Sequence, residues 1–289
     1  MNRKNFLKTG FLSAAVIGLG SKVMQLAGKT GETETEQGTI GYNHLPNKEI
    51  KTMNTVLHKA ETRGHANHGW LDTHHTFSFA NYMNPDRMHF GNLRVLNDDI
   101  VDGGMGFGTH PHNNMEIISI PLSGDLEHKD SMGNVAVIKQ NDIQIMSAGT
   151  GIYHSEYNKN TDNKVNFLQI WVFPKQKNIE PRYDQITLVA ADRDNKLQQI
   201  VSPGKDSAGV WINQDAWFYL GSLKKGFTTN HKLNLKGNGI YAFVINGNVT
   251  ISGQALNRRD GFGVWDTDAI DITADSDAEL LLMEVPMAI

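Results

Sequence analysis

The feature that most constrains the fold is a succession of short apolar alternations, each ended by glycine, asparagine or aspartate. From Thr55 onward the pattern recurs in LRVLNDD, MEIISIPLSG, VAVIKQND, IQIMSAGTG and NFLQIWVFP. Alternation with a period of two is typical of β-strands, and glycine and asparagine favour the tight turns between strands. The 28 glycines among 289 residues fit the same interpretation. The sequence therefore predicts an all-β fold.

The strand pattern occurs twice along the chain. It pauses at FPKQKNIEPRY, where Pro174 and Pro181 indicate a linker, and returns in WFYLGSL, IYAFVINGNVTISG and FGVWDTDAIDITADSDAELLLMEV. ISIPLSGDLEHKDSMGN and AFVINGNVTISGQALN both place a strand, a glycine-centred turn and a second strand in the same order. We interpret this as an internal duplication of a small β-barrel, with coincidental β texture as the alternative. The predicted domains are residues 55–174 and 175–289.

The N-terminus has the order of regions expected of an export signal. MNRKNFLKTGFLSAAVIGLGSK begins with basic residues and continues with an apolar run, residues 11–20, that is too short to span a bilayer. RKNFLK resembles the twin-arginine motif, with lysine in place of the second arginine. We predict a Tat-like signal over residues 1–29, a periplasmic location and a flexible polar linker over residues 30–54. A cytoplasmic protein with a frayed N-terminus is the alternative. An uncleaved anchor is a further one, because no clear Ala-x-Ala site follows.

Charge and composition narrow the classes of function. The net charge of −4 comes without a basic stripe, so nothing indicates a nucleic-acid partner. The chain has no cysteine, which excludes disulfides, thiolate metal sites and cysteine nucleophiles. Any metal must therefore be held by histidine and carboxylate. Ten of the twelve histidines lie between His58 and His154, so the chemistry is expected in the first half.

Two histidine-containing pairs are candidates for a metal site. In GFGTHPHNNME, His110 and His112 flank Pro111, which favours an extended backbone and so places both side chains on one face of a strand. In GIYHSEYN, His154 and Glu156 have the same spacing. If the two segments are neighbouring strands, three imidazoles and one carboxylate converge, a set that suits Fe(II), Mn(II), Ni(II) or Cu(II). A single H-x-H alone is more often a polar surface pair.

The spacing around these pairs resembles the two cupin motifs, G-x5-H-x-H-x3-E and G-x2-H-x3-N. The first is matched by Gly104, the two histidines and Glu116, and the second by Gly151, His154 and Asn158. This pattern nominates Glu116 as the acidic ligand. Glu116 and Glu156 both share strand parity with their histidines, so spacing alone leaves either one open.

A narrower resemblance follows from longer segments. RGHANHGWLDTHHTFSFANYMNPDRMHFGNLRVLNDD, GFGTHPHNNMEI, DLEHKDSMGN and QIMSAGTGIYHSEYN resemble the pirin family, and most closely its bacterial members described as quercetin 2,3-dioxygenases. The resemblance implies two tandem cupin (jelly-roll) β-barrels packed together, a bicupin, with metal only in the first. It implies one divalent metal, Fe(II) first and Ni, Mn, Cu or Zn as alternatives, on His110, His112, His154 and Glu156. Glu116 then becomes a carboxylate that supports either the metal ligands or the fold. The export segment departs from the usual members.

The resemblance also implies a reaction. A flavonol such as quercetin would lose its 3-hydroxyl proton, which Glu156 could accept, and react with O2 with ring opening and loss of carbon monoxide. The expected partners are therefore a flavonol and O2, for a monomeric protein without stable membrane insertion unless the signal is uncleaved. A metal-binding regulatory module without turnover is one alternative, and another cupin reaction, such as an isomerisation, is a second.

Other histidines have structural interpretations. We expect His65, His68 and His75 to be buried and hydrogen-bonded, close to Trp70 and Phe77. His74 is interpreted as facing solvent. His128 lies on an alternating strand, and either lines the pocket or bonds its neighbours.

Overall fold

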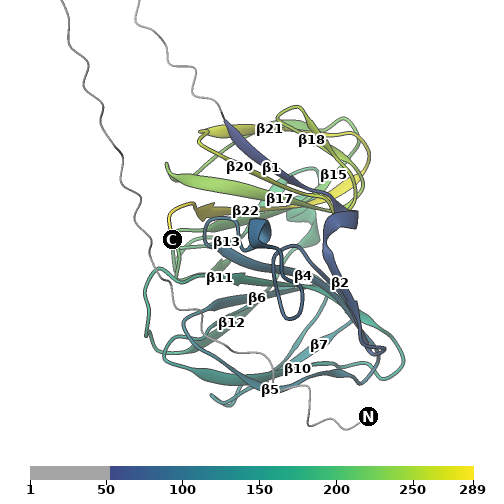
Figure 1. The fold of residues 1–289 in the computed structure, drawn as a ribbon, viewed down its shortest axis with the longest axis vertical. Coiled ribbons are helices and arrows are strands. Elements are labelled where there is room, and N and C mark those ends of the chain that lie inside the picture. Colours follow the sequence, from purple (N-terminus) through teal and green to yellow (C-terminus); the bar gives the residue numbers. More distant parts are fainter. Residues whose placement is uncertain (1–52) are drawn as a thin grey trace, which may run out of the picture. The chain divides into compact units, whose positions relative to one another are not determined.

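Two β-barrels pack against each other through their larger sheets (Figure 1). The computed structural model describes residues 53–289, which belong to one compact unit. Each barrel combines a seven-stranded and a four-stranded sheet, as the predicted all-β bicupin requires. The helices among the described residues are short 3₁₀ turns, η2 (Ala60–Thr62), η3 (Pro85–Arg87) and η4 (Ala190–Arg193).

The first barrel is built mainly from the first half of the chain. Its seven-stranded sheet has the order β12-β9-β6-β11-β4-β3-β2, and its four-stranded sheet has the order β5-β10-β7-β8. The strands of the larger sheet are β2 (Gly64–Asn67), β3 (Leu71–His75), β4 (Leu93–Val101), β6 (Glu116–Ser123), β9 (Asp142–Ser147), β11 (Val165–Val172) and β12 (Arg182–Thr187). Those of the smaller sheet are β5 (Gly106–His112), β7 (Leu126–Asp130), β8 (Val135–Ile138) and β10 (Ile152–Asn158).

The second barrel repeats this plan. Its larger sheet has the order β1-β20-β17-β22-β15-β13-β14, and its smaller sheet β16-β21-β18-β19. The strands of the larger sheet are β1 (Asn54–His58), β13 (Leu197–Ser202), β14 (Val210–Trp211), β15 (Trp217–Leu223), β17 (Asn238–Asn246), β20 (Gly261–Trp265) and β22 (Ala278–Pro286). Those of the smaller sheet are β16 (Thr228–Lys232), β18 (Val249–Ile251), β19 (Gln254–Leu256) and β21 (Ala269–Ala274).

Strand pairing crosses the predicted domain limits in both directions. β1 pairs along its whole length with β20, so residues 54–58 belong to the second barrel rather than the first. β12 pairs with β9, so residues 182–187 belong to the first barrel rather than the second. Each exchanged strand covers a sheet edge that would otherwise expose unpaired backbone groups. Each barrel therefore contains a strand from outside its own predicted segment of the chain.

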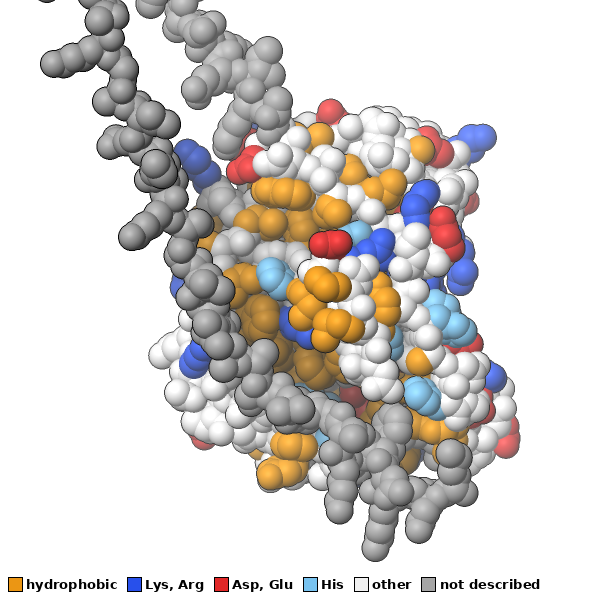
Figure 2. Space-filling view, viewed as in Figure 1, with side chains coloured by type: hydrophobic (Ala, Val, Ile, Leu, Met, Phe, Trp, Pro, Cys, Tyr) orange, Lys and Arg blue, Asp and Glu red, His pale blue; other side chains and the backbone are white. Residues whose placement is uncertain are grey.

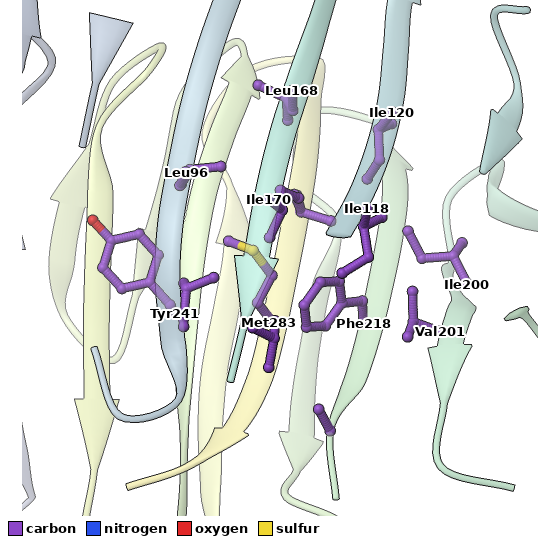
Figure 3. Close-up of a cluster of buried hydrophobic side chains, with 14 of the residues drawn as sticks. Leu96, Ile118, Ile120, Leu168, Ile170, Ile200, Val201, Phe218, Tyr241 and Met283 are labelled. Atoms are coloured by element: carbon purple, nitrogen blue, oxygen red, sulfur yellow. The ribbon is translucent and has the colours of Figure 1, made fainter. Parts of the chain in front are cut away.

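The main hydrophobic core lies between the two larger sheets (Figure 3). On β6, Ile118 and Ile120 enter this core, and the alternate residues Ile117 and Ser119 face the inside of the first barrel. Both faces of β6 are buried, so its apolar run is nearly continuous. The labelled core side chains are Leu96, Ile118, Ile120, Leu168 and Ile170 from the first barrel and Ile200, Val201, Phe218, Tyr241 and Met283 from the second.

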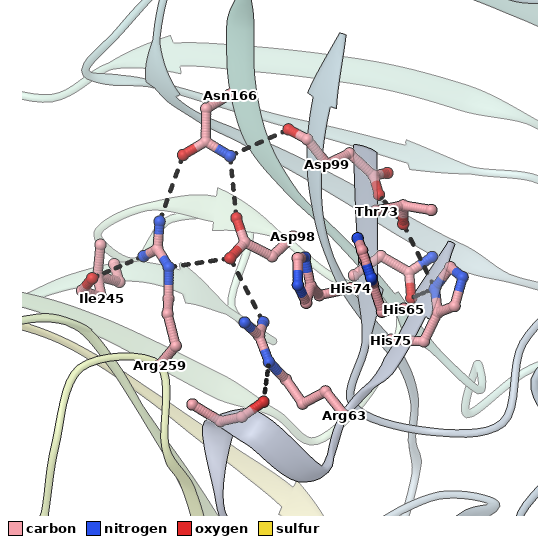
Figure 4. Close-up of polar contacts among 12 residues, drawn as sticks. Arg63, His65, Thr73, His74, His75, Asp98, Asp99, Asn166, Ile245 and Arg259 are labelled. Carbon is pink, nitrogen blue, oxygen red and sulfur yellow. Dashed lines mark hydrogen bonds and ion pairs between the residues drawn. The ribbon is translucent and has the colours of Figure 1, made fainter. Parts of the chain in front are cut away.

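Polar groups also connect the barrels (Figure 4). The Asp98 carboxylate on β4 accepts from Arg259 Nε at 2.9 Å and from Arg63 Nη1 at 3.4 Å. Its second oxygen accepts from Asn166 Nδ2 at 2.9 Å. Arg259 precedes β20, so a buried carboxylate of one barrel is paired with a guanidinium of the other.

The surface drawn in Figure 2 carries side chains of both charges beside one another. No helix among the described residues is long and apolar enough to cross a membrane. The predicted export signal, and the predicted linker up to residue 52, lie outside the described residues.

Candidate metal centre

Three histidine side chains meet inside the first barrel, where β5 pairs with β10. The antiparallel register places His154 opposite His110, and Ile152 opposite His112. The three ring centroids lie 4.5–4.9 Å apart. One nitrogen from each ring lies within 4.8 Å of the other two. The structure thus brings together all three histidines proposed as ligands from the sequence.

Pro111 sits between two of these histidines without disturbing the sheet. It pairs opposite Tyr153, whose side chain is exposed, so both residues point away from the barrel interior. β5 is the edge strand of its sheet, and a proline there removes no interior ladder hydrogen bond. The i, i+2 spacing therefore turns His110 and His112 inward together.

In His110 and His154, hydrogen bonds determine which ring nitrogen keeps a free lone pair. His110 Nδ1 lies 2.8 Å from the carbonyl oxygen of Gly108, so it carries the proton and donates, which leaves Nε2 with a lone pair. His154 Nδ1 lies 3.5 Å from Nδ1 of His128, whose Nε2 lies 3.1 Å from Asp130 Oδ2. Since Asp130 accepts from His128, His128 Nδ1 accepts from His154. His154 Nε2 is buried and has no hydrogen-bond partner.

The surroundings hold these rings neutral. Burial lowers the pKa of His110 below its usual value, although the bond to Gly108 opposes this. Burial, with His110 nearby, lowers the pKa of His112 to about 3. Burial and the three neighbouring histidines lower the pKa of His154 further. Neutral imidazoles with free lone pairs are the form that binds metal, so this donor set fits a divalent transition-metal ion.

Glu156 follows His154 on β10 and is fully buried within the barrel. The pairing of β10 with β5 is irregular between these two residues, and Glu156 lies opposite Phe107. Its carboxylate is not among the ligand atoms that lie within 4.8 Å of one another. Both of its oxygens are hydrogen-bonded, Oε1 to Ser119 Oγ at 3.0 Å and Oε2 to Gln169 Nε2 at 2.7 Å. The role of Glu156 as a ligand stays a prediction.

The bonds around Glu156 favour a protonated carboxyl group. Ser119 Oγ also lies 2.9 Å from Gln169 Oε1, so a hydroxyl with one proton faces two acceptors. If Glu156 is protonated, it donates to Ser119, which donates to Gln169, and every group is satisfied. Burial, partly opposed by these bonds, raises the pKa of Glu156 to about 7. This carboxyl group can therefore gain or lose a proton near neutral pH.

Glu116, the acidic residue of the cupin pattern, makes hydrogen bonds away from the three histidines. Its Oε2 accepts from Ser147 Oγ at 2.7 Å and from the backbone N–H of Asn213 at 3.1 Å. Asn213 follows β14 of the second barrel, so this buried carboxyl group joins the two barrels. Burial raises its pKa above the usual value. Glu116 thus has a structural position between the barrels, and its exclusion as a metal ligand stays a prediction.

The other histidines divide between core and surface. His75 is buried, and its Nδ1 lies 2.9 Å from Asn97 Oδ1, as expected. The expected burial was wrong for His65 and His68, which are exposed because β2 is the edge strand of its sheet and His68 lies in the turn after it. The expected hydrogen bond is present at His65, whose Nε2 lies 2.8 Å from Asp72 Oδ1. His74 is half-buried, with its ring stacked on that of His65. His128 is fully buried and bonds its neighbours.

Three residues that the sequence did not predict for the site make hydrogen bonds to Glu156 or His128. Ser119 and Gln169 bond Glu156, and Asp130 orients His128. Asp130 follows His128 by two residues on β7, so strand parity could have suggested it. Ser119 and Gln169 are isolated polar residues in apolar strands, ISIPLS and FLQIWV, and that is the signal that could have found them.

Comparisons with known proteins agree with this architecture. Residues 32–172 match the family described as Pirin, and residues 199–285 match the family described as Quercetinase C-terminal cupin domain. The chain is 46% identical over 230 residues to the quercetin 2,3-dioxygenase of Escherichia coli K12, covering 80% of this chain and 98% of that protein. It is 40% identical to a pirin-like protein of Caulobacter vibrioides, covering 76% of this chain and 95% of that protein.

A solved structure of similar sequence has the same fold. The crystal structure of the bacterial pirin YhhW from Escherichia coli in complex with nickel(II) superimposes with a TM-score of 0.77 at 44% identity. The similarity covers 81% of this chain and 99% of that one. A protein of this fold and similar sequence thus binds a divalent transition metal.

Proposed function

This chain belongs to the pirin family of bicupins, and we propose that it is a metal-dependent quercetin 2,3-dioxygenase. The substrate is a flavonol, which is cleaved with O2 inside the first barrel. The observation that carries the proposal is the convergence of three neutral imidazoles within 4.8 Å, two of them buried and one half-buried, and one with a buried nitrogen that has no partner. Relatives named quercetin 2,3-dioxygenase match the chain over four-fifths of its length.

The residues proposed to hold the ion are His110, His112 and His154, with Glu156 as the fourth ligand. A bound divalent ion supplies Lewis-acid polarisation of a substrate oxygen. We propose Fe(II) as the ion. Nickel, which the Escherichia coli pirin holds, and manganese, copper and zinc are the alternatives that metal analysis separates. Neutral nitrogen ligands with one carboxylate suit all of these ions, so the donor set supports a transition metal rather than Mg²⁺ or Ca²⁺.

Glu156 is proposed to take the proton of the flavonol 3-hydroxyl. Without a bound ion, burial raises its pKa to about 7, so the protein environment itself favours proton uptake by this carboxylate. Ser119 and Gln169 hold the carboxyl group in place. Both can donate hydrogen bonds to the ionised carboxylate, and the Ser119 hydroxyl can accept one from the protonated form. Loss of this proton makes the substrate electron-rich toward O2, and the family's reaction then opens the ring with release of carbon monoxide.

Trp171 forms part of the wall beside the centre. Its ring packs edge-on against His112 at 4.9 Å and against Phe79 at 5.4 Å. Trp171 Nε1 is buried and has no hydrogen-bond partner. An apolar surface with one free donor suits a flat aromatic substrate that carries oxygen atoms.

The test is incubation of the full chain with quercetin without oxygen, followed by admission of air. Oxygen uptake and carbon monoxide release are expected from protein loaded with one of the five metals. Both should be lost in His110→Ala/His154→Ala and strongly reduced in Glu156→Gln, and both should be retained in Glu116→Gln. Quercetin binding without turnover at every metal loading would overturn the dioxygenase proposal in favour of a binding module. Conversion without oxygen uptake would point to an isomerase.

We further propose that the chain is exported through its Tat-like N-terminus and acts as a monomer. The basic residues followed by a short apolar run in residues 1–29 support export. Fractionation of cells that express the full chain, and of cells expressing an Arg3→Gln/Lys4→Gln variant, tests this proposal. Periplasmic recovery that depends on both residues is expected, and equal cytoplasmic recovery of both proteins contradicts it.

A further inference from the structure

The hairpin of β2 and β3 carries a second group of potential metal ligands, outside the barrel. His65 on β2 lies directly opposite His74 on β3, and Asp72 is two residues before His74 on the same face. One ligand atom from each of the three lies within 4.8 Å of the other two. His65 Nε2 is 2.8 Å from Asp72 Oδ1, and His74 Nδ1 is 3.9 Å from the same oxygen.

This group is separate from the centre inside the barrel. Strand alternation buries Thr73 and His75 on the inner face of β3 and turns Asp72 and His74 to the outer face. The side chains of His65, Asp72 and His74 are 53%, 38% and 34% exposed, so an ion can reach them directly from solvent. Figure 4 shows His65 and His74 on the hairpin beside Asp98.

The two imidazole rings of this group are stacked. Their centroids lie 4.4 Å apart at an interplanar angle of 20°. Burial, with the nearby Arg63, lowers the pKa of His74. The charge of Arg63 is itself balanced by Asp98, which lies opposite His74 on β4.

From this geometry we propose that His65, Asp72 and His74 form a second, surface binding site for a divalent transition-metal ion of the Zn²⁺ class. Two imidazoles and one carboxylate select Zn²⁺, Ni²⁺ or Cu²⁺ over the oxygen-preferring Mg²⁺ and Ca²⁺. Bonds of about 2 Å to a tetrahedral ion place ligand atoms roughly 3.3 Å apart. Asp72 Oδ1 lies 2.8 Å from His65 Nε2 and 3.9 Å from His74 Nδ1, and the stacked rings, which are partly exposed, would rotate so that a nitrogen of each faces the ion. Water would complete the coordination.

The alternative is that Asp72 and His65 form only an exposed ion pair. Such a pair contributes little to stability and does not require the second ring. It does not explain why His74 brings a third ligand atom to the same place. Metal stoichiometry separates the two interpretations, since only a metal site adds a second ion to each chain.

The test uses the full chain without a polyhistidine tag, stripped of metal and equilibrated by dialysis against Zn²⁺. We expect two ions per wild-type chain and one in His65→Ala/His74→Ala. His110→Ala/His154→Ala should also bind one, at the outer site, so this result does not depend on the proposed enzyme activity. The matched control is His89→Ala, which removes an exposed histidine outside both groups and should keep two ions.

A second variant guards against a folding defect. Asp72→Asn keeps both rings and the hairpin, and should lower only the affinity of the outer ion, with the far-ultraviolet circular dichroism unchanged. The proposal is overturned if His65→Ala/His74→Ala binds as much Zn²⁺ as the wild type with the same affinity. It is also overturned if His110→Ala/His154→Ala binds none.

Discussion

The Nδ1 atoms of His128 and His154 lie 3.5 Å apart inside the first barrel. With Asp130 beyond His128, this contact makes a carboxylate–imidazole–imidazole chain that ends at the free Nε2 of His154. Such partners behind a ligand fix its tautomer and ring orientation and raise its basicity. His154 is therefore prepared as a ligand by residues that lie outside the proposed ligand set.

Replacing His128 with phenylalanine should weaken metal binding while keeping the fold. The change retains the ring that packs on Tyr183 at 4.7 Å but removes the acceptor for His154. We expect a roughly 10- to 100-fold lower metal affinity, the usual effect of losing such a partner. Titration with a competing chelator measures it. Lys129→Ala, at the neighbouring exposed position, is the control. Equal metal affinities in the two variants would argue against a role for the Asp130–His128–His154 hydrogen bonds in metal binding.

Glu156 should make the stability of the metal-free protein depend on pH. Burial raises its pKa from 4.5 to about 7, so between these values the folded state binds more protons than the unfolded state. The free energy of unfolding that Glu156 contributes is therefore fully present below pH 4.5 and falls as the pH rises toward 7.

Glu156→Gln, which cannot ionise and mimics the protonated group, isolates this effect. The variant should gain roughly 3 kcal/mol over the wild type between pH 4.5 and 7.5, at 1.36 kcal/mol per pKa unit. Urea unfolding in the presence of a chelator, at several pH values, measures the difference. A difference between the two proteins that does not change with pH would mean that folding does not raise the pKa of Glu156.

Substitution of Glu116 and of Glu156 should have different effects on metal binding. Glu116→Gln keeps a side chain that can still accept from Asn213 N–H and Ser147, so we expect unchanged metal stoichiometry and a modest loss of stability. Glu156→Gln should lower metal affinity without destabilising the protein at neutral pH. Elemental analysis and thermal unfolding of both variants provide the comparison. Loss of metal in Glu116→Gln alone would restore the general cupin pattern as the correct ligand set.

Strand alternation made the fold and the histidine cluster predictable. Parity fixes which side chains of one strand share a face, so His110 and His112 could be placed together, and His154 could be added on the condition that its strand is their neighbour. It does not identify pairing partners, which is why the exchange of β1 and β12 between barrels was not foreseen. Nor does it reveal an irregular register, such as the one between His154 and Glu156. The residues around Glu156 lie 37 and 13 positions away, and only the fold brings them close.

Asp98 should be a major contributor to the stability of the paired barrels. Its side chain is 9% exposed and is held by Arg63, Arg259 and Asn166. Asp98→Asn keeps the shape but leaves two largely buried guanidinium groups without a counter-charge. We expect a loss of about 3–5 kcal/mol in the free energy of unfolding, the usual result of removing one partner from a buried pair.

The control for Asp98→Asn is Lys224→Ala, which breaks the ion pair with Asp277. Those side chains are 66% and 70% exposed, so solvent and salt screen the pair, and we expect almost no change in the free energy of unfolding. Urea unfolding of the metal-free proteins at pH 7 measures both variants. If Asp98→Asn costs no more than Lys224→Ala, the hydrophobic core between the sheets holds the barrels together without help from the buried charges.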